Sequence, residues 1–126
     1  MNTNTNPVTW FEIYTHDIER AKVFYEHVFS YTLEAQPTDG TFEAYLFPGK
    51  MPGNGAMGAL LRHPMRQPSS EGNLIYFHCM DCSITADLAL RNGGTVFRPK
   101  MSIGPDGFIA ILGDTEGNAI GIHSFE

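Results

Sequence analysis

Two patterns that decide the fold meet in the stretch Trp10-Phe-Glu-Ile-Tyr-Thr-His-Asp-Ile-Glu-Arg-Ala-Lys-Val-Phe-Tyr25. In residues 8–14 the purely apolar Phe11 and Ile13 alternate with Trp10, Glu12 and Tyr14, which carry polar groups, and this alternation is typical of a half-buried strand. Asp17 then supplies a helix N-cap, and apolar residues follow it at helical spacing up to Phe29. The stretch therefore predicts a strand that leads directly into an amphipathic helix.

The same pattern returns 64 residues later, where Asp81 takes the place of Asp17. Asn118 then falls in register with Asn54, and a strand-like stretch follows each of them. A repeat of this length fits only twice, so it indicates a duplicated supersecondary unit rather than a solenoid.

We therefore expect a single α+β domain over residues 1–126, built from two tandem β-α-β-β-β units that form a curved mixed sheet around a cleft. Unit one covers about residues 8–61, a connector covers 62–73, and unit two covers about 74–125. Helices are expected at 18–29 and 83–91. The expected strands are 8–14, 32–35, 42–47, 56–61, 74–79, 95–98, 108–112 and 119–124.

Composition excludes several classes of protein. The chain has 8 Lys and Arg against 14 Asp and Glu, which gives a formal net charge of -6. The basic residues are few and scattered, so we expect no nucleic-acid partner and no membrane surface, because both need clustered positive charge. The polar start lacks a secretory signal pattern and no apolar run reaches transmembrane length, so we expect a cytoplasmic protein.

The two cysteines form the motif Cys79-Met-Asp-Cys82 at the second strand-to-helix junction. Such a motif can be a redox site. However, Cys79 falls on the apolar face of its strand, and the chain has no second cysteine pair to complete a zinc site. We interpret both cysteines as structural.

Alternation also predicts which side chains face the cleft, away from the helices. The last strand of unit one is expected to turn Ala56, Gly58, Leu60 and Arg62 to this face, and the other strands contribute Trp10, Glu12, Tyr14, Leu74, Tyr76, His78, Ala119, Gly121 and His123. A carboxylate and two imidazoles in a partly apolar cleft can act as an acid/base set or as metal ligands. Glu12, His78 and His123 are therefore the candidate catalytic residues.

The candidate ligand-binding residues are mostly aromatic, because flat rings stack on the rings of a ligand. They are Trp10, Tyr14, Tyr76, Tyr45 and Arg62.

The stretch 10–25, together with Asn92-Gly-Gly94 and Asp114-Thr-Glu-Gly-Asn-Ala-Ile-Gly-Ile-His123, resembles the glyoxalase, bleomycin-resistance and extradiol-dioxygenase superfamily, also called vicinal oxygen chelate proteins. The resemblance runs from about residue 8 to 125 and is strongest to small single-domain members related to lactoylglutathione lyase. It implies the duplicated fold and a homodimer in which units from two chains close the clefts. Ser30 departs from the glycine that the family commonly has at this helix end.

The resemblance also implies where a metal would bind. Metal-dependent members take ligands from the first, fourth, fifth and eighth strands, and the corresponding positions here are Trp10, Gly58, Leu74 and Gly121. None of these side chains ligates a metal in the way His, Gln or Glu does. We therefore expect no metal at the family positions and no cofactor, with a divalent metal at a shifted site as the alternative.

Three functions remain open for a protein whose partner is a small organic molecule. The first is a metal-free enzyme, with Glu12 or His78 as general base and His123 as its partner acid. The second is a protein that sequesters an aromatic or antibiotic-like compound without catalysis, as the resemblance to the bleomycin-resistance branch implies. The third is a metalloenzyme, a lyase or dioxygenase, with a shifted site made of two histidines and one carboxylate. If the protein is an enzyme, it resembles the lyases, isomerases and dioxygenases of this family.

Overall fold

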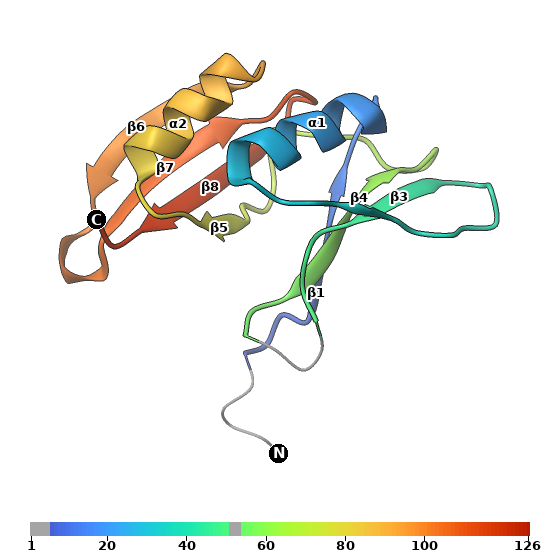
Figure 1. Cartoon of the computed structure of the whole chain (residues 1–126), viewed down its shortest axis with the longest axis horizontal. Helices are drawn as coiled ribbons and strands as arrows, with labels where there is room; N and C mark the ends of the chain where they lie inside the picture. Colours follow the sequence, from blue (N-terminus) through green and yellow to red (C-terminus); the bar gives the residue numbers. More distant parts are fainter. Residues whose placement is uncertain (1–5, 51–53) are drawn as a thin grey trace.

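The computed structural model describes residues 6–50 and 54–126, and it contains two units of the same order (Figure 1). Unit one has β1 (Trp10–Tyr14), α1 (Ile18–Phe29), β2 (Glu34–Ala35), β3 (Glu43–Leu46) and β4 (Met57–Arg62). Unit two has β5 (Tyr76–His78), α2 (Cys82–Arg91), β6 (Thr95–Ser102), the short 3-10 helix η1 (Gly104–Asp106), β7 (Phe108–Gly113) and β8 (Ala119–Ser124). The predicted duplicated β-α-β-β-β order is confirmed.

The strands form two four-stranded mixed sheets, in the orders β1-β4-β3-β2 and β5-β8-β7-β6. In each sheet the first strand of the unit pairs parallel with the last, and the remaining pairs are antiparallel. The α+β class and the two-unit architecture are confirmed, with the mixed sheet divided into two halves. The largest difference from the expected strand bounds is in β6, which extends four residues beyond its expected end and has register shifts against β7.

Both helices begin as the sequence predicts. The Asp17 carboxylate accepts a hydrogen bond from the Arg20 amide at 3.1 Å, and the Asp81 carboxylate accepts one from the Ser83 amide at 2.9 Å. Each carboxylate satisfies an amide that has no partner within the helix. At the end of α1, Ser30 has φ 58° and ψ 38°, the left-handed conformation that favours glycine.

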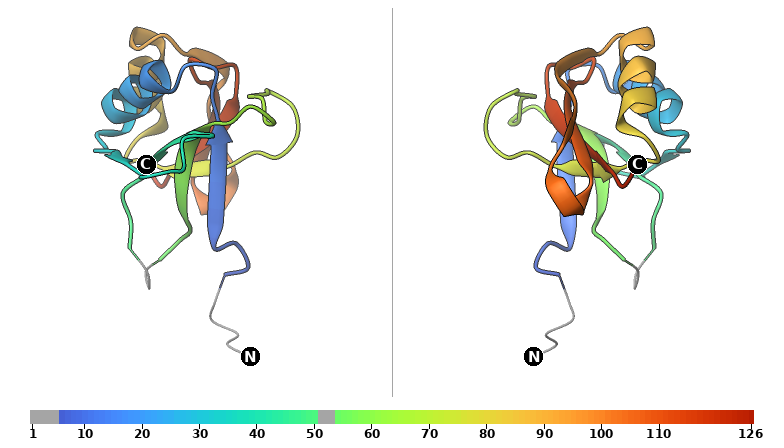
Figure 2. Two further views of the ribbon diagram at one scale, coloured as in Figure 1. Left: turned by 90° about the vertical axis from the view of Figure 1, so that its right-hand side faces the viewer. Right: turned by 90° about the vertical axis from the view of Figure 1, so that its left-hand side faces the viewer.

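The two helices lie side by side on one side of the molecule (Figure 2) and cover a core that both units share. Unit one contributes Ile13 and Leu60 from its sheet, and unit two contributes Phe77 and Ile122 from the other. Tyr25 of α1 is fully buried and stacks edge-on against Phe24 and Phe47. In the described part of the chain, no helix is long and apolar enough to cross a membrane.

The predicted facing of β4 was wrong by one residue. β4 pairs in parallel with β1, and the register matches Trp10 with Met57 and Ile13 with Leu60. Leu60 is therefore on the helix side, where it is completely buried. Gly58 and Arg62 share this side by alternation, and the ring of Phe11 lies against Gly58. The outward positions of β4 are Met57, Ala59 and Leu61.

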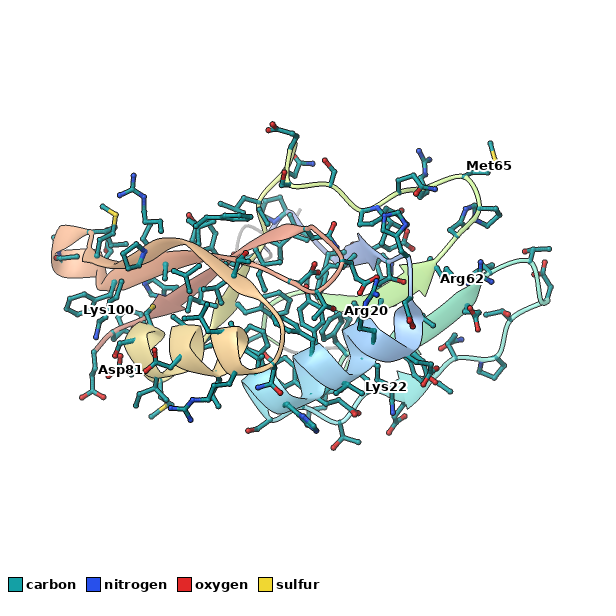
Figure 3. The ribbon with its side chains drawn as sticks, turned by 90° about the horizontal axis from the view of Figure 1, so that it is seen from above. Arg20, Lys22, Arg62, Met65, Asp81 and Lys100 are labelled. Carbon is teal, nitrogen blue, oxygen red and sulfur yellow. The ribbon has the colours of Figure 1, made fainter. Side chains whose placement is uncertain are left out.

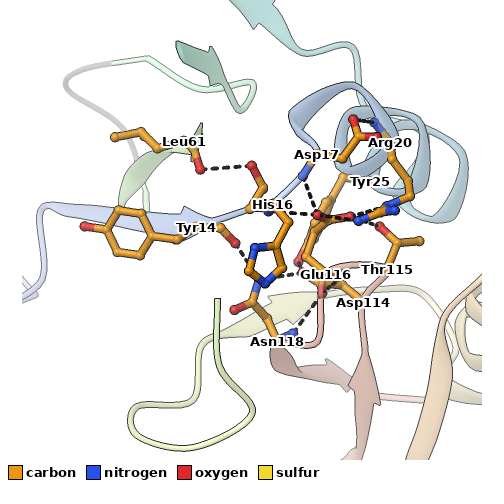
Figure 4. A network of polar contacts seen from close by, with 11 residues as sticks. Tyr14, His16, Asp17, Arg20, Tyr25, Leu61, Asp114, Thr115, Glu116 and Asn118 are labelled. Carbon is orange, nitrogen blue, oxygen red and sulfur yellow. Dashed lines mark hydrogen bonds and ion pairs between the residues drawn. The ribbon is translucent and has the colours of Figure 1, made fainter. Parts of the chain in front are cut away.

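A buried carboxylate joins the loop before β8 to the start of α1 (Figure 4). Glu116 accepts hydrogen bonds from the amides of His16 and Asp17 at 2.9 and 2.8 Å, and it forms an ion pair with Arg20 at 2.7 Å. Its side chain has no exposed surface. Burial alone would raise the pKa of Glu116, but the hydrogen bonds from Arg20 and from the backbone outweigh this effect and lower the pKa to about 2.

The same loop makes two further contacts between the units. Asn118 donates from its side-chain amide to the Tyr14 carbonyl at 2.8 Å and to Asp114 at 2.9 Å. Asp114 also accepts a hydrogen bond of 2.7 Å from the buried Tyr25 hydroxyl. We call Asp114, Glu116 and Asn118 the inter-unit clasp, because they fix β1 and α1 of unit one against β8 of unit two.

Candidate functional site

The outward face of the first sheet presents Trp10, Glu12 and Tyr14 in a row, as the alternation of β1 predicts. The Trp10 indole donates from Nε1 to Glu12 Oε2 at 3.1 Å, and the Tyr14 hydroxyl donates to Glu12 Oε1 at 2.7 Å. Burial raises the pKa of Tyr14, and its hydrogen bond to Glu12 raises it further. The Glu12 carboxylate is thus held between two aromatic side chains on a rigid strand.

A hollow of about 370 Å³ lies beside this row. We call it the Trp10 hollow, and its lining residues are Trp10, Glu12, Gln36, Phe42, Ala44, Leu46, Met57, Ala59 and Leu61. Ala44, Ala59 and Leu61 form a small buried cluster of their own, separate from the main core. The floor of the hollow is therefore apolar and well packed, while Trp10 at its edge is 43% exposed.

Glu12 also borders a second hollow, of about 240 Å³, between β1, the connector and the start of β8. This hollow is more polar, because Glu71, Asn73 and Asn118 line it. Glu12 therefore lies between the two hollows and lines both of them, and neither hollow is lined by a histidine.

The two candidate histidines lie together in unit two. His78 on β5 and His123 on β8 are register partners in a parallel pair, so they are neighbours on one face. His123 Nε2 lies 2.7 Å from the carbonyl oxygen of Asp106, and the Phe125 ring meets the His123 ring edge-on at 4.7 Å between centroids. The structure thus brings His78 and His123 together and places Glu12 on the other sheet.

Tyr76 precedes His78 by two residues and faces the same way. Its ring lies over Gly121 of β8, and it lines a larger crevice of about 600 Å³ together with His78, Val8 and Leu74. An aromatic side chain thus accompanies the histidines, as the repeat predicts.

Two candidate binding residues, Tyr45 and Arg62, lie on the helix side of the first sheet. The Tyr45 hydroxyl donates to Glu19 of α1 at 2.5 Å, and Lys22 lies over its ring at 5.2 Å. Arg62, at the end of β4 in Figure 3, pairs with Glu43 at 2.5 Å. Their facing follows from the register of β3 and β4, so neither side chain lies in the row of Glu12.

The expected metal positions need one correction, because Gly58 faces the helix and Ala59 holds the outward place on β4. Ala59, like Leu74 and Gly121, carries no metal-binding group. Over residues 6–50 and 54–126, no three His, Cys, Asp or Glu side chains lie close enough to hold a metal ion. Glu12, His78 and His123 are thus not gathered into a ligand set within one chain.

Cys79 and Cys82 are free, buried thiols whose sulfur atoms lie 3.9 Å apart. Burial raises the pKa of Cys79 to about 11. Since the thiolate is the reactive form, Cys79 is a poor nucleophile at neutral pH.

Sequence reasoning missed the inter-unit clasp and the β3 wall of the Trp10 hollow. The run Asp114-Thr-Glu-Gly-Asn118 contains two carboxylates beside a turn glycine, but nothing in it indicates that Glu116 reaches unit one. The wall residues Phe42, Ala44 and Leu46 are every second residue, with Phe42 just before β3 and the other two on it. The pairing of β3 with β4 decides which face they take, and that pairing is not local.

Comparisons with known proteins agree with this architecture. Residues 8–42 match the family described as bleomycin resistance protein-like N-terminal. No curated protein matches the sequence significantly.

Three solved structures illustrate the likeness in fold. A glyoxalase/bleomycin resistance protein/dioxygenase family enzyme from Burkholderia phytofirmans PsJN is 17% identical, with a TM-score of 0.69 over 94% of this chain and 98% of that one. A glyoxalase/bleomycin resistance protein from Albidiferax ferrireducens T118 is 20% identical, with a TM-score of 0.69 over 94% and 98%. TnmS3, an antibiotic binding protein from Streptomyces sp. CB03234, is 22% identical, with a TM-score of 0.68 over 99% and 100%. The chain has the glyoxalase/bleomycin-resistance fold, and its resemblance to the vicinal oxygen chelate superfamily is confirmed.

Proposed function

We propose that the protein binds a small organic molecule with an aromatic or apolar body in the Trp10 hollow and does not transform it. The observation that carries this proposal is the hollow itself, in which an exposed indole stands at the edge of an apolar floor. Ligand sites are typically concave and mostly apolar, with a few polar groups that orient the ligand. Here Glu12 and Gln36 are those polar groups.

The energetics favour occupation of this face by an apolar body. Trp10 is 43% exposed, and a ring stacked on it removes apolar surface from water at about 25 cal/mol per Å². Geometrically favourable aromatic pairs contribute about 0.5–1.5 kcal/mol more. The hydrogen bond to Glu12 restricts the rotation of the indole, so less side-chain entropy is lost when a ligand binds.

Two findings from outside the chain support binding without catalysis. TnmS3, which shares the fold over its full length, is described as an antibiotic binding protein. The family matched by residues 8–42 is also named for resistance to an antibiotic. Within one chain, moreover, the three candidate acid/base residues are divided between two sheets.

Binding can be measured directly, because Trp10 is the one tryptophan in the sequence. We expect one-ring aromatic compounds to change its fluorescence in a saturable way, with matching heats in calorimetry. Trp10→Leu should weaken the calorimetric affinity about tenfold or more. The matched control is Leu90→Ala on the exposed surface of α2, which should leave affinity unchanged. Saturable binding that Trp10→Leu does not weaken would refute this site.

We also propose that two copies of the chain assemble. The outward face of the second sheet exposes Leu74, Tyr76 and Phe97. Exposed apolar patches of this kind often mark interfaces, and the superfamily resemblance implies a homodimer in which units from two chains close the clefts. Sedimentation at micromolar concentration should give twice the monomer mass of 14.0 kDa, and Phe97→Asp should reduce it to the monomer value. A wild-type monomer would refute the assembly.

A second candidate function is acid/base catalysis, and it is favoured by the adjacent histidines. The Asp106 carbonyl can only accept, so His123 donates from Nε2 and, when neutral, leaves Nδ1 as a proton acceptor. A turnover assay on any ligand found by fluorescence tests this role. Activity that falls for His123→Gln and His78→Gln, with unchanged affinity, would replace the binding proposal, and a complete lack of turnover would retire the catalytic one.

We also propose that the protein acts in the cytoplasm, where a pair of buried thiols such as Cys79 and Cys82 is kept reduced. Detection of the native protein in a cytoplasmic fraction tests this.

A further inference from the structure

We propose that the molecule bound in the Trp10 hollow carries a positive charge, which pairs with the carboxylate of Glu12. This inference rests on the proposed binding function and adds the chemical class of the ligand, a small amine or other organic cation with an aromatic or apolar body. It follows from the charges around the hollow and from the way Glu12 is held.

The first step concerns the charges that line the hollow. Eight of the nine lining residues are uncharged, and the remaining one is Glu12. A bound anion would therefore meet a like charge with no compensating Lys or Arg, whereas a cation would meet an opposite charge. The formal net charge of -6 adds a long-range attraction for cations.

The second step is that Glu12 has no cationic partner in the part of the chain that the structure describes. The four ion pairs found there involve Glu116, Glu26, Glu43 and Asp81. Arg66 of the connector lies close enough to the Tyr14 hydroxyl to lower its pKa by charge and by a hydrogen bond, but none of the four ion pairs joins it to Glu12. The negative charge of Glu12 is thus available to a ligand.

The third step concerns orientation. Each Glu12 oxygen accepts one hydrogen bond, Oε2 from Trp10 and Oε1 from Tyr14, so the carboxylate is fixed on β1. A carboxylate has about four acceptor sites, and these two bonds leave two of them free. The indole turns its N–H edge toward the carboxylate, so an ammonium group pairs with Glu12 while the apolar body of the ligand lies against Trp10 and the floor. Glu12 and Trp10 can therefore hold different parts of the same ligand.

The fourth step concerns size. A hollow of about 370 Å³ is at the lower end of the range for small-molecule sites, which is roughly 300–1,000 Å³. Such a space accepts one ring and a short chain, so that the ring contacts the floor of Ala44, Ala59 and Leu61 while the charge reaches Glu12.

Three probes of one shape but different charge test the proposal on the full chain: phenylbutylammonium, phenylbutanol and phenylbutanoate. Trp10 fluorescence and calorimetry should show phenylbutylammonium binding roughly five- to tenfold more tightly than phenylbutanol, and phenylbutanoate more weakly than either. The preference for the cation should decrease as salt is raised.

The test variant is Glu12→Gln, which keeps the acceptor oxygen and the shape but removes the charge. It should abolish the preference for phenylbutylammonium and leave the affinity for phenylbutanol within about twofold. The matched control is Asp87→Asn on the exposed surface of α2, which changes the net charge equally far from the hollow and should keep the preference.

Failure of this inference can be distinguished from failure of the binding function. If phenylbutanol and phenylbutylammonium bind equally, or if Glu12→Gln keeps the preference, the charged ligand is refuted while binding at the hollow stands. If none of the three probes binds, both proposals are refuted. If Asp87→Asn removes the preference as well, the attraction comes from net charge and the pairing with Glu12 is refuted.

Discussion

Removing the charge of Glu116 should destabilise the whole fold, because this residue joins the two units. In Glu116→Gln the oxygen can still accept from the His16 and Asp17 amides, but the new amide group points a donor at the Arg20 guanidinium. The charge-assisted bond between Arg20 and Glu116 is thereby replaced by two N–H donors that face each other. The side chain at position 116 is fully buried, so water cannot relieve this clash.

The magnitude follows from the pKa of Glu116, which folding lowers from 4.5 to about 2. A shift of this size corresponds to at most about 3 kcal/mol. Arg20 is half exposed, so solvent screening reduces this contribution to about 2 kcal/mol. Because the folded-state pKa lies below the unfolded value, the contribution is present in full above the unfolded pKa and is lost as the pH falls towards about 2.

Chemical denaturation at a series of pH values is the assay. At neutral pH we expect Glu116→Gln to lower the free energy of unfolding by about 2 kcal/mol. The difference from wild type should shrink as the pH falls from about 5 towards 2, because wild-type Glu116 becomes protonated there. Asp87→Asn, an exposed carboxylate on α2, should show neither effect. A Glu116→Gln variant as stable as wild type at neutral pH, or a difference that does not depend on pH, would refute the role of the clasp.

Three further experiments test other features of the structure. Ser30→Gly should raise the free energy of unfolding by about 1 kcal/mol, as measured by denaturation, because Ser30 holds φ 58°; a loss of stability would contradict the left-handed conformation. Gly58→Ala should lower it by about 1–3 kcal/mol, because the new methyl group would collide with the Phe11 ring, whereas Gly40→Ala meets no neighbouring atom and tests strain from its φ of 93° alone. Cys79 should resist alkylation at pH 8 and react faster as the pH approaches about 11, provided the protein stays folded; rapid labelling at neutral pH would show that its pKa is not raised.

The local features of the fold could be predicted from the sequence. Asp17 and Asp81 each precede a helix with apolar residues at helical spacing, and both caps form as expected. The order of elements could be predicted from the repeat, because the same order of strand and helix patterns occurs in both halves of the sequence. His78 and His123 also came together as expected, because the strands that end at them are partners within one unit.

The features that failed depend on contacts between distant segments. The stretch from Met57 to Leu61 has no polar side chain, so alternation cannot show which of its residues face the helices. The parallel register with β1 determines this. The separation of Glu12 from the histidines has a similar cause. The packing of α1 against α2 sets how the two sheets are placed, and no single element encodes that packing.

The shared core has a consequence for how the protein folds. Each unit has a complete sheet and a complete helix, yet the main core draws side chains from both, so neither half encloses this core by itself. Thermal unfolding should therefore be a single cooperative transition in which both sheets are lost together. A chain cut between β4 and β5, at residues 63–75, would yield two pieces that are each unstructured alone and regain structure when mixed. The internal repetition of this chain has thus produced mutual dependence between its halves instead of redundancy.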